Sequence, residues 1–191
     1  MGKKNLYIIA GCNGAGKTTA SFNILPDILS CQEFVNADEI ARGISPFNPE
    51  KVALEAGRLM LNRINELMEI GEDFAFETTL ATKSHQNRVI EARKKGYYIT
   101  LVFYWLDSPE LAKRRVKLRV KEGGHNIPAD VIERRYFAGI KNLFNLYLPI
   151  CDYTLLYDNS LTSPVLIMEN ELNGDETIHD LIKLKAIKAF L

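Results

Sequence analysis

A glycine-rich motif near the start of the chain constrains its fold more than any other feature. Gly11-Cys-Asn-Gly-Ala-Gly-Lys17-Thr18 matches the pattern G-x-x-x-x-G-K-[ST] at every fixed position. A short apolar run, 6–10, precedes the motif, and a helical pattern, 17–25, follows it. In such a strand, loop and helix, backbone N–H groups and the positive end of the helix dipole surround phosphate oxygens. We therefore expect a nucleoside triphosphate to bind here, at Gly11, Asn13, Gly14, Ala15, Gly16, Lys17, Thr18 and Thr19.

Two residues of the motif have specific expected roles. Lys17 should reach the β- and γ-phosphates and take part in catalysis, and the hydroxyl of Thr18 should bind Mg²⁺. The motif alone does not separate kinases from other nucleotide-binding proteins. The chain lacks the Asn-Lys-x-Asp sequence with which GTPases read their base, and it lacks the signature loop of transporter ATPases. These absences favour a kinase, with ATP and Mg²⁺ as cofactors.

The rest of the chain alternates short apolar runs with amphipathic stretches. This alternation predicts an α/β fold of the phosphate-loop (P-loop) NTPase type, nucleoside-kinase-like, with a mostly parallel sheet of about five or six strands and flanking helices. The expected strands are 6–10, 33–36, 74–77, 97–106, 153–157 and 165–168. The expected helices are 17–25, 49–70, 83–95, 109–121, 128–148 and 176–190. No composition shift divides the chain, so we expect one domain over residues 1–191.

The charge balance and the cysteines limit the partners and the compartment. Lys and Arg together number 24, as do Asp and Glu, which gives a formal net charge of +0. This balance speaks against a nucleic acid partner, and no stretch reaches the ~20 apolar residues of a membrane span. Three scattered cysteines, Cys12, Cys31 and Cys151, indicate reduced thiols rather than a disulfide framework. We expect a cytoplasmic protein that contacts neither a membrane nor nucleic acid.

Carboxylates follow two of the expected strands. Asp38 comes just after the second strand, and Glu77-Thr78-Thr79 ends the third. Ligands of open α/β sheets bind at the carboxyl ends of the strands, so these residues should face the phosphate loop. Asp38 is suited to accept a proton from an acceptor hydroxyl or, alternatively, to cap a short helix, 39–42. Glu77 is suited to hold Mg²⁺ through water or to bind acceptor hydroxyls, and Thr79 is suited to contact either ligand.

A basic stretch with a glycine break is expected to form a lid over the phosphates, at about residues 109–135. Arg115 and Arg119 are four residues apart and share one helix face, while Arg134 follows the break Gly123-Gly124. Guanidinium groups suit the negative charge that spreads over a transferring phosphoryl group. His125, beside the glycines, is either a lid contact or, as we favour, a residue that orders the lid loop. The pattern leaves the phosphate contact open among Arg114, Arg115, Arg119, Arg134 and Arg135.

Four elements in this order and spacing resemble the zeta toxin family of small P-loop kinases. They are Gly11–Thr18, Val35-Asn-Ala-Asp38, Phe76-Glu77-Thr78-Thr79, and Arg119 through Gly-Gly-His to Arg134-Arg135-Tyr136. The resemblance covers about residues 6–158 and is closer to the short chromosomal branch of the family. It implies that Asp38 is the catalytic base, that Glu77 and Thr79 contact the acceptor, and that Arg119 and Arg134 stabilise the transferring phosphoryl group.

The resemblance also implies the chemistry and the partners. The expected enzyme is an ATP- and Mg²⁺-dependent phosphotransferase with an alcohol group as acceptor. The favoured acceptor is a UDP-amino-sugar such as UDP-N-acetylglucosamine. Zeta-type kinases are often held inactive by a partner that blocks the nucleotide site, so an inhibitory antitoxin protein is a further expected partner.

Two other functions remain compatible with the motifs. A polynucleotide-end kinase would share this layout, and the basic stripe 113–121 would support it. A non-catalytic ATP-binding regulatory module would need only the loop and the lid. The carboxylates Asp38 and Glu77 favour chemistry over binding alone, because binding of ATP requires neither. A small-molecule kinase is therefore the leading prediction.

Overall fold

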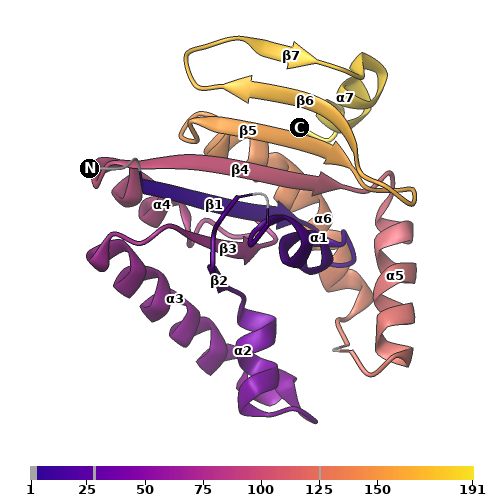
Figure 1. The fold of residues 1–191 in the computed structure, drawn as a ribbon. Coiled ribbons are helices and arrows are strands. Elements are labelled where there is room, and N and C mark those ends of the chain that lie inside the picture. Colours follow the sequence, from indigo (N-terminus) through magenta and orange to yellow (C-terminus); the bar gives the residue numbers. More distant parts are fainter. Residues whose placement is uncertain (1–3, 28, 125) are drawn as a thin grey trace.

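In the computed structural model, which describes residues 4–27, 29–124 and 126–191, the chain forms a sheet of seven strands. Their order is β2-β3-β1-β4-β5-β6-β7 (Figure 1). The first five in this order are parallel, whereas β6 and β7 are antiparallel to their neighbours. The strands are β1 (Lys4–Gly11), β2 (Glu33–Val35), β3 (Phe74–Thr78), β4 (Tyr97–Trp105), β5 (Tyr153–Asp158), β6 (Val165–Glu171) and β7 (Glu176–Ile178). The α/β fold with a mostly parallel sheet is confirmed.

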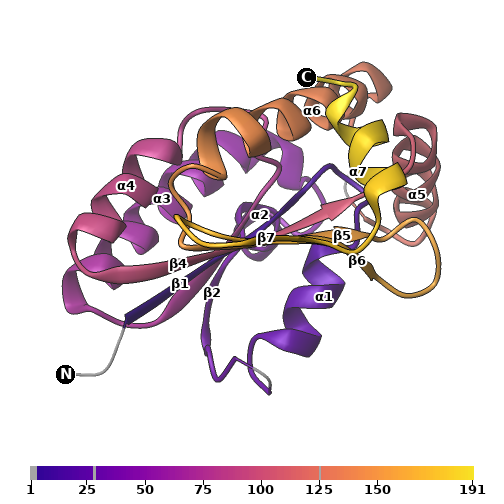
Figure 2. The same ribbon diagram turned by 90° about the horizontal axis from the view of Figure 1, so that it is seen from above.

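Helices cover both faces of this sheet. Figure 2 shows α1 on one face and α4 and α6 on the other. Strands β1 and β4 lie in the interior of the sheet, and their side chains are accordingly apolar on both faces, as Ile8, Ile9 and Phe103 illustrate. The helices are α1 (Lys17–Ile24), α2 (Ala37–Ile44), α3 (Ala53–Ile70), α4 (Gln86–Lys94), α5 (Pro109–Lys121), α6 (Ala129–Asn142) and α7 (Leu181–Lys188), with a 3-10 turn η1 (Pro49–Val52) and a π-helical turn η2 (Leu143–Tyr147). Among the residues described, no helix has the length and apolar character needed to cross a membrane.

Local sequence rules explain several helix boundaries. Helix α3 ends at Gly71, whose φ of 79° is left-handed and favours glycine. Helix α5 begins with Pro109, and the side chain of Ser108 accepts a hydrogen bond from the backbone N–H of Leu111. These residues define where α3 ends and where α5 begins.

The parallel register brings the polar ends of several strands to one edge of the sheet. Ala10 pairs with Thr78, and Gly11 pairs with Tyr104. Trp105 pairs with Asp158 at the end of β5. The phosphate loop after β1, Glu77 near the end of β3 and the segment after β5 are therefore neighbours.

The structure corrects four details of the expected fold. The sheet has seven strands rather than five or six within the described residues, because 176–178 pairs with β6 instead of opening a helix. Helix α7 is correspondingly confined to Leu181–Lys188, where the side chain of Asp180 caps it. Residues 49–52 form a 3-10 turn ahead of α3, and the short helix expected at 39–42 extends from 37 to 44. The expected role of His125 lies outside the described residues.

Candidate active site

The phosphate loop turns sharply at the end of β1 and needs glycine at two positions. Gly11 has a φ of 139°, and a Cβ there would lie 2.3 Å from the carbonyl oxygen of Tyr104. Gly16 has a φ of 82°, and a Cβ there would lie 2.6 Å from Nδ2 of Asn159. Gly16 is also the N-cap of α1 and has no side chain to occupy the first N–H groups of the helix. These N–H groups face the loop as donors for phosphate oxygens.

Lys17 is buried at the centre of the loop, with 6% of its surface exposed. Its Nζ donates a hydrogen bond to the carbonyl oxygen of Cys12 at 3.0 Å and lies 3.4 Å from Oε1 of Glu77. An ammonium group has three donors, so one direction remains for a phosphate oxygen. Lys17 lines a cavity of about 170 Å³, here called the phosphate cavity.

Glu77 is attached to the phosphate loop by a second set of contacts. Its Oε2 accepts a hydrogen bond from Oγ1 of Thr18 at 2.7 Å and another from Nδ2 of Asn36 at 2.8 Å. Glu77 is therefore in direct contact with the hydroxyl expected to bind the metal. Of the two roles considered for Glu77, this position favours the Mg²⁺ side of the site over a contact with the acceptor alone.

The residues at this point suit Mg²⁺. A hydroxyl and a carboxylate are hard oxygen ligands, and Mg²⁺ is commonly held by one or two carboxylates together with waters and substrate phosphates. Across the described ranges, no group of three or more His, Cys, Asp or Glu residues could hold a metal ion. Thr18 and Glu77 would thus hold Mg²⁺ jointly with a bound triphosphate.

Asp38 is not the cap of the helix that follows β2. Oδ1 of Asn36 accepts hydrogen bonds from the backbone N–H groups of Asp38, at 2.8 Å, and Glu39, at 3.3 Å. The capping role considered for Asp38 therefore belongs to Asn36, which fits the N-cap position two residues earlier. The carboxylate of Asp38 is left to line the phosphate cavity beside Lys17 and Thr18.

Asp38 also lines two cavities next to the phosphate cavity. The first, here called the inner cavity, has a volume of about 250 Å³. Its polar lining includes Asn36, Glu77, Thr79, Thr82, His85 and Arg135. The second, the outer cavity, has a volume of about 360 Å³ and is lined by Thr19, Phe22, Arg42, Pro49 and Arg119, among others. A molecule in either cavity would lie beside both Asp38 and the phosphate site.

Thr79 lies where the inner cavity meets the loop after β3. Its Oγ1 accepts a hydrogen bond from the backbone N–H of Ala81 at 3.4 Å. The neighbouring Thr78 makes the equivalent contact with Leu80 at 3.1 Å. Both threonines line the inner cavity, so the structure brings the whole Glu77-Thr78-Thr79 segment to it.

The two arginines of α5 have different surroundings. The guanidinium of Arg115 donates to the carbonyl oxygens of Asn159, at 2.8 Å, and Ser160, at 3.0 Å. This fork fastens α5 to the segment that follows β5. Arg119, one turn further along, lines both the phosphate cavity and the outer cavity. Both residues share one face of the helix, as their spacing predicts.

On α6 the structure brings Arg135, rather than Arg134, to the phosphate loop. Arg134 is exposed, whereas Nη1 of Arg135 donates a hydrogen bond to Oδ1 of Asn13 at 3.1 Å. Burial lowers the pKa of Arg135, while the charge of Asp38 raises it. An arginine keeps its charge under such shifts, so Arg135 presents a cation to the inner cavity. Arg134 is exposed in this structure, and its expected contact with the phosphates stays a prediction.

Two asparagines of the site are not predicted from the sequence. Asn36 caps α2 and donates a hydrogen bond to Glu77. The spacing Asn36-x-x-Glu39, which is typical of a helix start, could have indicated the capping role. Asn159 donates from Nδ2 to the carbonyl oxygen of Ala15 at 2.8 Å. The position of Asn159 directly after β5 could have indicated a role in the site, because the carboxyl end of β5 lies at the same edge of the sheet as those of β2 and β3.

These features define a class of protein. The loop lysine and threonine contact a carboxylate from β3, and a second carboxylate follows β2. Arginines of α5 line the phosphate cavity, and Arg135 of α6 lines the adjoining inner cavity. This is the constellation of a P-loop kinase, a phosphotransferase.

The comparison with known proteins gives the family. Residues 1–148 match the family model described as Zeta toxin, and the chain belongs to the zeta toxin family. An uncharacterised protein of Haemophilus influenzae is 33% identical over 144 residues, which are 71% of this chain and 100% of that protein. The chain is accordingly a kinase-type phosphotransferase.

Solved structures share the fold at low sequence identity. AvrRxo1-ORF1:AvrRxo1-ORF2 with sulphate ions matches with a TM-score of 0.78 and 15% identity, over 97% of this chain and 63% of that chain. The same pair has also been solved with ATP, with a TM-score of 0.77. A structure of the PezAT chromosomal toxin-antitoxin system of Streptococcus pneumoniae matches with a TM-score of 0.66 and 16% identity, over 99% of this chain and 85% of that chain. The chain thus shares the fold of these proteins.

Proposed function

We propose that the chain is an ATP- and Mg²⁺-dependent kinase that phosphorylates a hydroxyl group of a UDP-amino-sugar such as UDP-N-acetylglucosamine. The observation that carries the proposal is the position of Asp38. Its carboxylate lines the phosphate cavity together with Lys17 and also lines the two adjoining cavities. A base at that junction lies between a bound γ-phosphate and an acceptor in either neighbouring cavity. We infer one kinase domain over residues 1–191.

In the proposed reaction, Asp38 accepts the proton of the acceptor hydroxyl. The acceptor oxygen forms a bond to the γ-phosphorus of ATP, and the bond from that phosphorus to the β–γ bridging oxygen breaks. ADP leaves with the electron pair of that bond. Bound Mg²⁺ would neutralise charge on the phosphate oxygens. Lys17 and Arg119, which line the phosphate cavity, are placed to stabilise the same charge.

Arg135 is a further candidate cation on α6, next to the Arg134 that the family resemblance implies. It is held by Asn13 of the phosphate loop and lines the inner cavity with Asp38. A cation there would contact either the γ-phosphoryl group or an anionic part of the acceptor. Arg134 remains a prediction from the family resemblance.

The acceptor class rests on family membership and on the cavities beside Asp38. Hydroxyl, amide and carboxylate groups from Thr79, Thr82, Asn36 and Glu77 line the inner cavity. Such groups bind the hydroxyls of a sugar by hydrogen bonds. The outer cavity adds room for a larger substrate on the other side of Asp38.

The test is transfer from γ-labelled ATP to a panel of sugar nucleotides, with the products separated and counted. We expect label on UDP-N-acetylglucosamine, and we expect Asp38→Asn to abolish transfer while a fluorescent ATP analogue still binds. Asp175→Asn, a change at an exposed aspartate, is the matched control and should transfer at the normal rate. Label found only in inorganic phosphate would count against the proposed acceptor. A normal rate of transfer by Asp38→Asn would contradict the role of Asp38 as the base.

We also infer an inhibitory antitoxin partner and a cytoplasmic location. The structural neighbours support the partner, because two of them are the AvrRxo1-ORF1:AvrRxo1-ORF2 pair and a toxin-antitoxin system. The three cysteines are free and buried, which suits a reducing compartment. Co-purification of this chain with the product of a neighbouring gene would test the partner.

A further inference from the structure

The residue that follows β5, Asn159, is hydrogen-bonded to three parts of the nucleotide site. Its backbone N–H donates to the carbonyl oxygen of Trp105 at 2.9 Å, which fixes the residue at the end of β4. Its own carbonyl oxygen accepts a hydrogen bond from Nη1 of Arg115 at 2.8 Å. Its side chain donates from Nδ2 to the carbonyl oxygen of Ala15 at 2.8 Å. One half-buried residue therefore connects β4, α5 and the phosphate loop at the end of the sheet where β5 ends (Figure 1).

The hydrogen bond to Ala15 sets the direction of a donor for phosphate. The carbonyl group of Ala15 and the N–H of Gly16 belong to one peptide group, which is planar and trans, so the two groups point in opposite directions. Because Asn159 holds the carbonyl oxygen, the N–H of Gly16 points away from Asn159. Gly16 lines the phosphate cavity, where loop N–H groups are suited to donate to phosphate oxygens.

The packing around the loop glycines supports the same role independently of the hydrogen bond. A Cβ at Gly16 would lie 2.6 Å from Nδ2 of Asn159, so the amide occupies the space that a side chain would need. On the neighbouring side, a Cβ at Gly14 would lie 2.8 Å from the carbonyl oxygen of Ala112 on α5. Helix α5 is itself fastened to Asn159 through Arg115. The loop is thus held between Asn159 and a helix that Asn159 also binds.

We propose that Asn159 is a positioning residue of the phosphate loop, whose amide orients the peptide group between Ala15 and Gly16 so that the N–H of Gly16 meets a phosphate oxygen of ATP. An amide suits this role because it donates a hydrogen bond and carries no charge. A carboxylate would repel both the carbonyl oxygen and the phosphates. Asn159 lies beyond residues 1–148, which the family model matches. The inference rests on the ATP-binding part of the proposed function and is independent of the acceptor.

Two variants test the amide. Asn159→Ala deletes the donor, and Asn159→Asp keeps the shape of the side chain but puts a negative oxygen in place of the donor. We expect the Kd for ATP to rise about tenfold in Asn159→Ala, the range of one lost hydrogen bond. It should rise about 100-fold in Asn159→Asp, where charge repulsion adds to that loss. The Kd for inorganic triphosphate, measured by competition with a fluorescent ATP analogue, should rise by the same factors, because the loop binds phosphates and not the base.

A matched control separates this role from a general contribution to stability. Asn5→Ala also removes a 2.8 Å hydrogen bond donated by an asparagine Nδ2, here to Asp73 at the opposite end of the sheet. This variant should lower the Tm and leave the Kd for ATP and for triphosphate unchanged. Hydrogen exchange of the phosphate loop, measured without nucleotide, should become about fivefold faster in Asn159→Ala and stay unchanged in Asn5→Ala.

The outcomes separate this inference from the proposed function. Weaker binding of ATP and of triphosphate by both Asn159 variants, with normal binding by Asn5→Ala, supports the positioning role. Weaker binding of ATP alone would place Asn159 at the base and overturn it. Unchanged binding or unchanged exchange of the loop in Asn159→Ala, with normal transfer, overturns the positioning role and leaves the kinase intact. Absence of binding of either probe to the normal protein would contradict the proposed function and overturn the inference with it.

Discussion

The contact between Glu77 and Lys17 predicts that one conservative change will act in opposite directions on stability and on nucleotide binding. Glu77→Gln keeps the shape of the side chain and removes its charge. In the free protein this change leaves the ammonium of Lys17, 6% exposed, without its carboxylate 3.4 Å away. A bound triphosphate would then provide the missing negative charge.

The size of the effect follows from the geometry. At an effective dielectric constant of about 20, opposite unit charges 3.4 Å apart attract by about 5 kcal/mol, and desolvation of the pair offsets much of that. Oε2 of Glu77 accepts hydrogen bonds from Thr18 and Asn36, and a glutamine oxygen retains acceptor capacity for these. We expect a net loss of about 2 kcal/mol in the free energy of unfolding. For a chain of this length the loss corresponds to a decrease in Tm of about 4–8 °C.

The assay is thermal unfolding with and without ATP in the presence of a chelator. We expect Glu77→Gln to melt earlier than the normal protein when free, and to bind metal-free ATP about fivefold more tightly, because the triphosphate no longer competes with a carboxylate for Lys17. Transfer with Mg²⁺ should fall about 100-fold through loss of the metal contact. Glu55→Gln, at an exposed position on α3, is the control and should leave all three quantities nearly unchanged. An unchanged Tm, or weaker metal-free binding of ATP, would refute the reasoning.

Three further predictions concern single side chains. Arg135→Lys should lower the rate of transfer about tenfold or more, since Arg135 contacts the phosphate loop at Asn13 and lysine cannot reproduce its fork. Lys183→Met should lower the free energy of unfolding, measured in urea, by about 1 kcal/mol and weaken the binding of ATP a few-fold. The change breaks the 2.7 Å contact with the buried Asp158, and the effect on stability is modest because Lys183 is 35% exposed. Because the pKa of His85 is about 4 in the folded chain and near 6.5 when unfolded, only the unfolded chain gains its proton as the pH falls through this window. Stability should therefore decline from pH 6.5 to 4, by at most about 3 kcal/mol, and His85→Phe should flatten that part of a pH series of urea melts.

The sheet and the phosphate loop could be predicted from the sequence because local patterns determine them. The pattern G-x-x-x-x-G-K-[ST] needs left-handed φ values, which the structure has at Gly14 and Gly16. Apolar runs such as β4 mark strands that are covered on both faces. The rule that ligands lie at the carboxyl ends of parallel strands correctly placed Asp38 and Glu77 beside the loop.

The choice between neighbouring side chains could not be predicted in this way. Arg134 and Arg135 are adjacent, and only the rotation of α6 against the loop decides which one reaches Asn13. Strand β7 is three exposed residues, 176–178, and it forms by pairing with β6 rather than by an apolar pattern of its own. Both features depend on contacts between segments far apart in the chain, for which a single sequence gives no direct signal.

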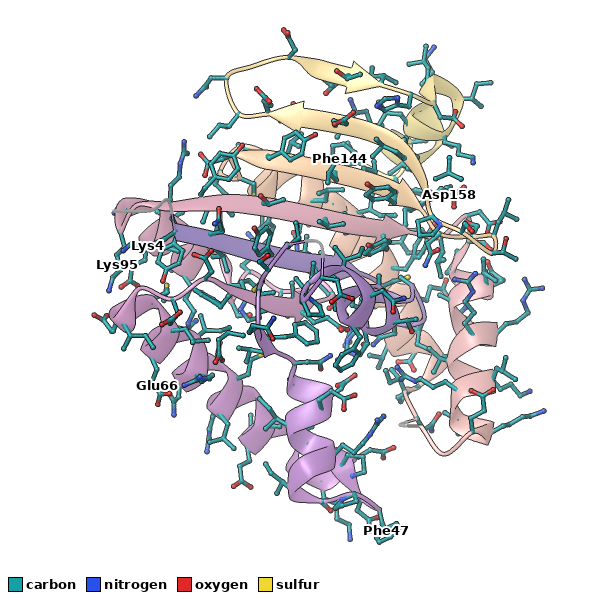
Figure 3. All side chains as sticks on the ribbon, viewed as in Figure 1. Lys4, Phe47, Glu66, Lys95, Phe144 and Asp158 are labelled. Carbon is teal, nitrogen blue, oxygen red and sulfur yellow. The ribbon has the colours of Figure 1, made fainter. Side chains whose placement is uncertain are left out.

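The part of the chain beyond the family match contributes to the nucleotide site through a chain of contacts. Lys183 on α7 holds Asp158, which Figure 3 labels near the end of β5. Burial alone would raise the pKa of Asp158, but hydrogen bonds from Lys183 and Ser160 lower it, so the carboxylate remains charged. Ser160 and Asn159 in turn bind Arg115 of the expected lid, and Asn159 also binds the phosphate loop at Ala15. These contacts connect α7 to the phosphate loop, and they are the reason why Lys183→Met is expected to weaken the binding of ATP.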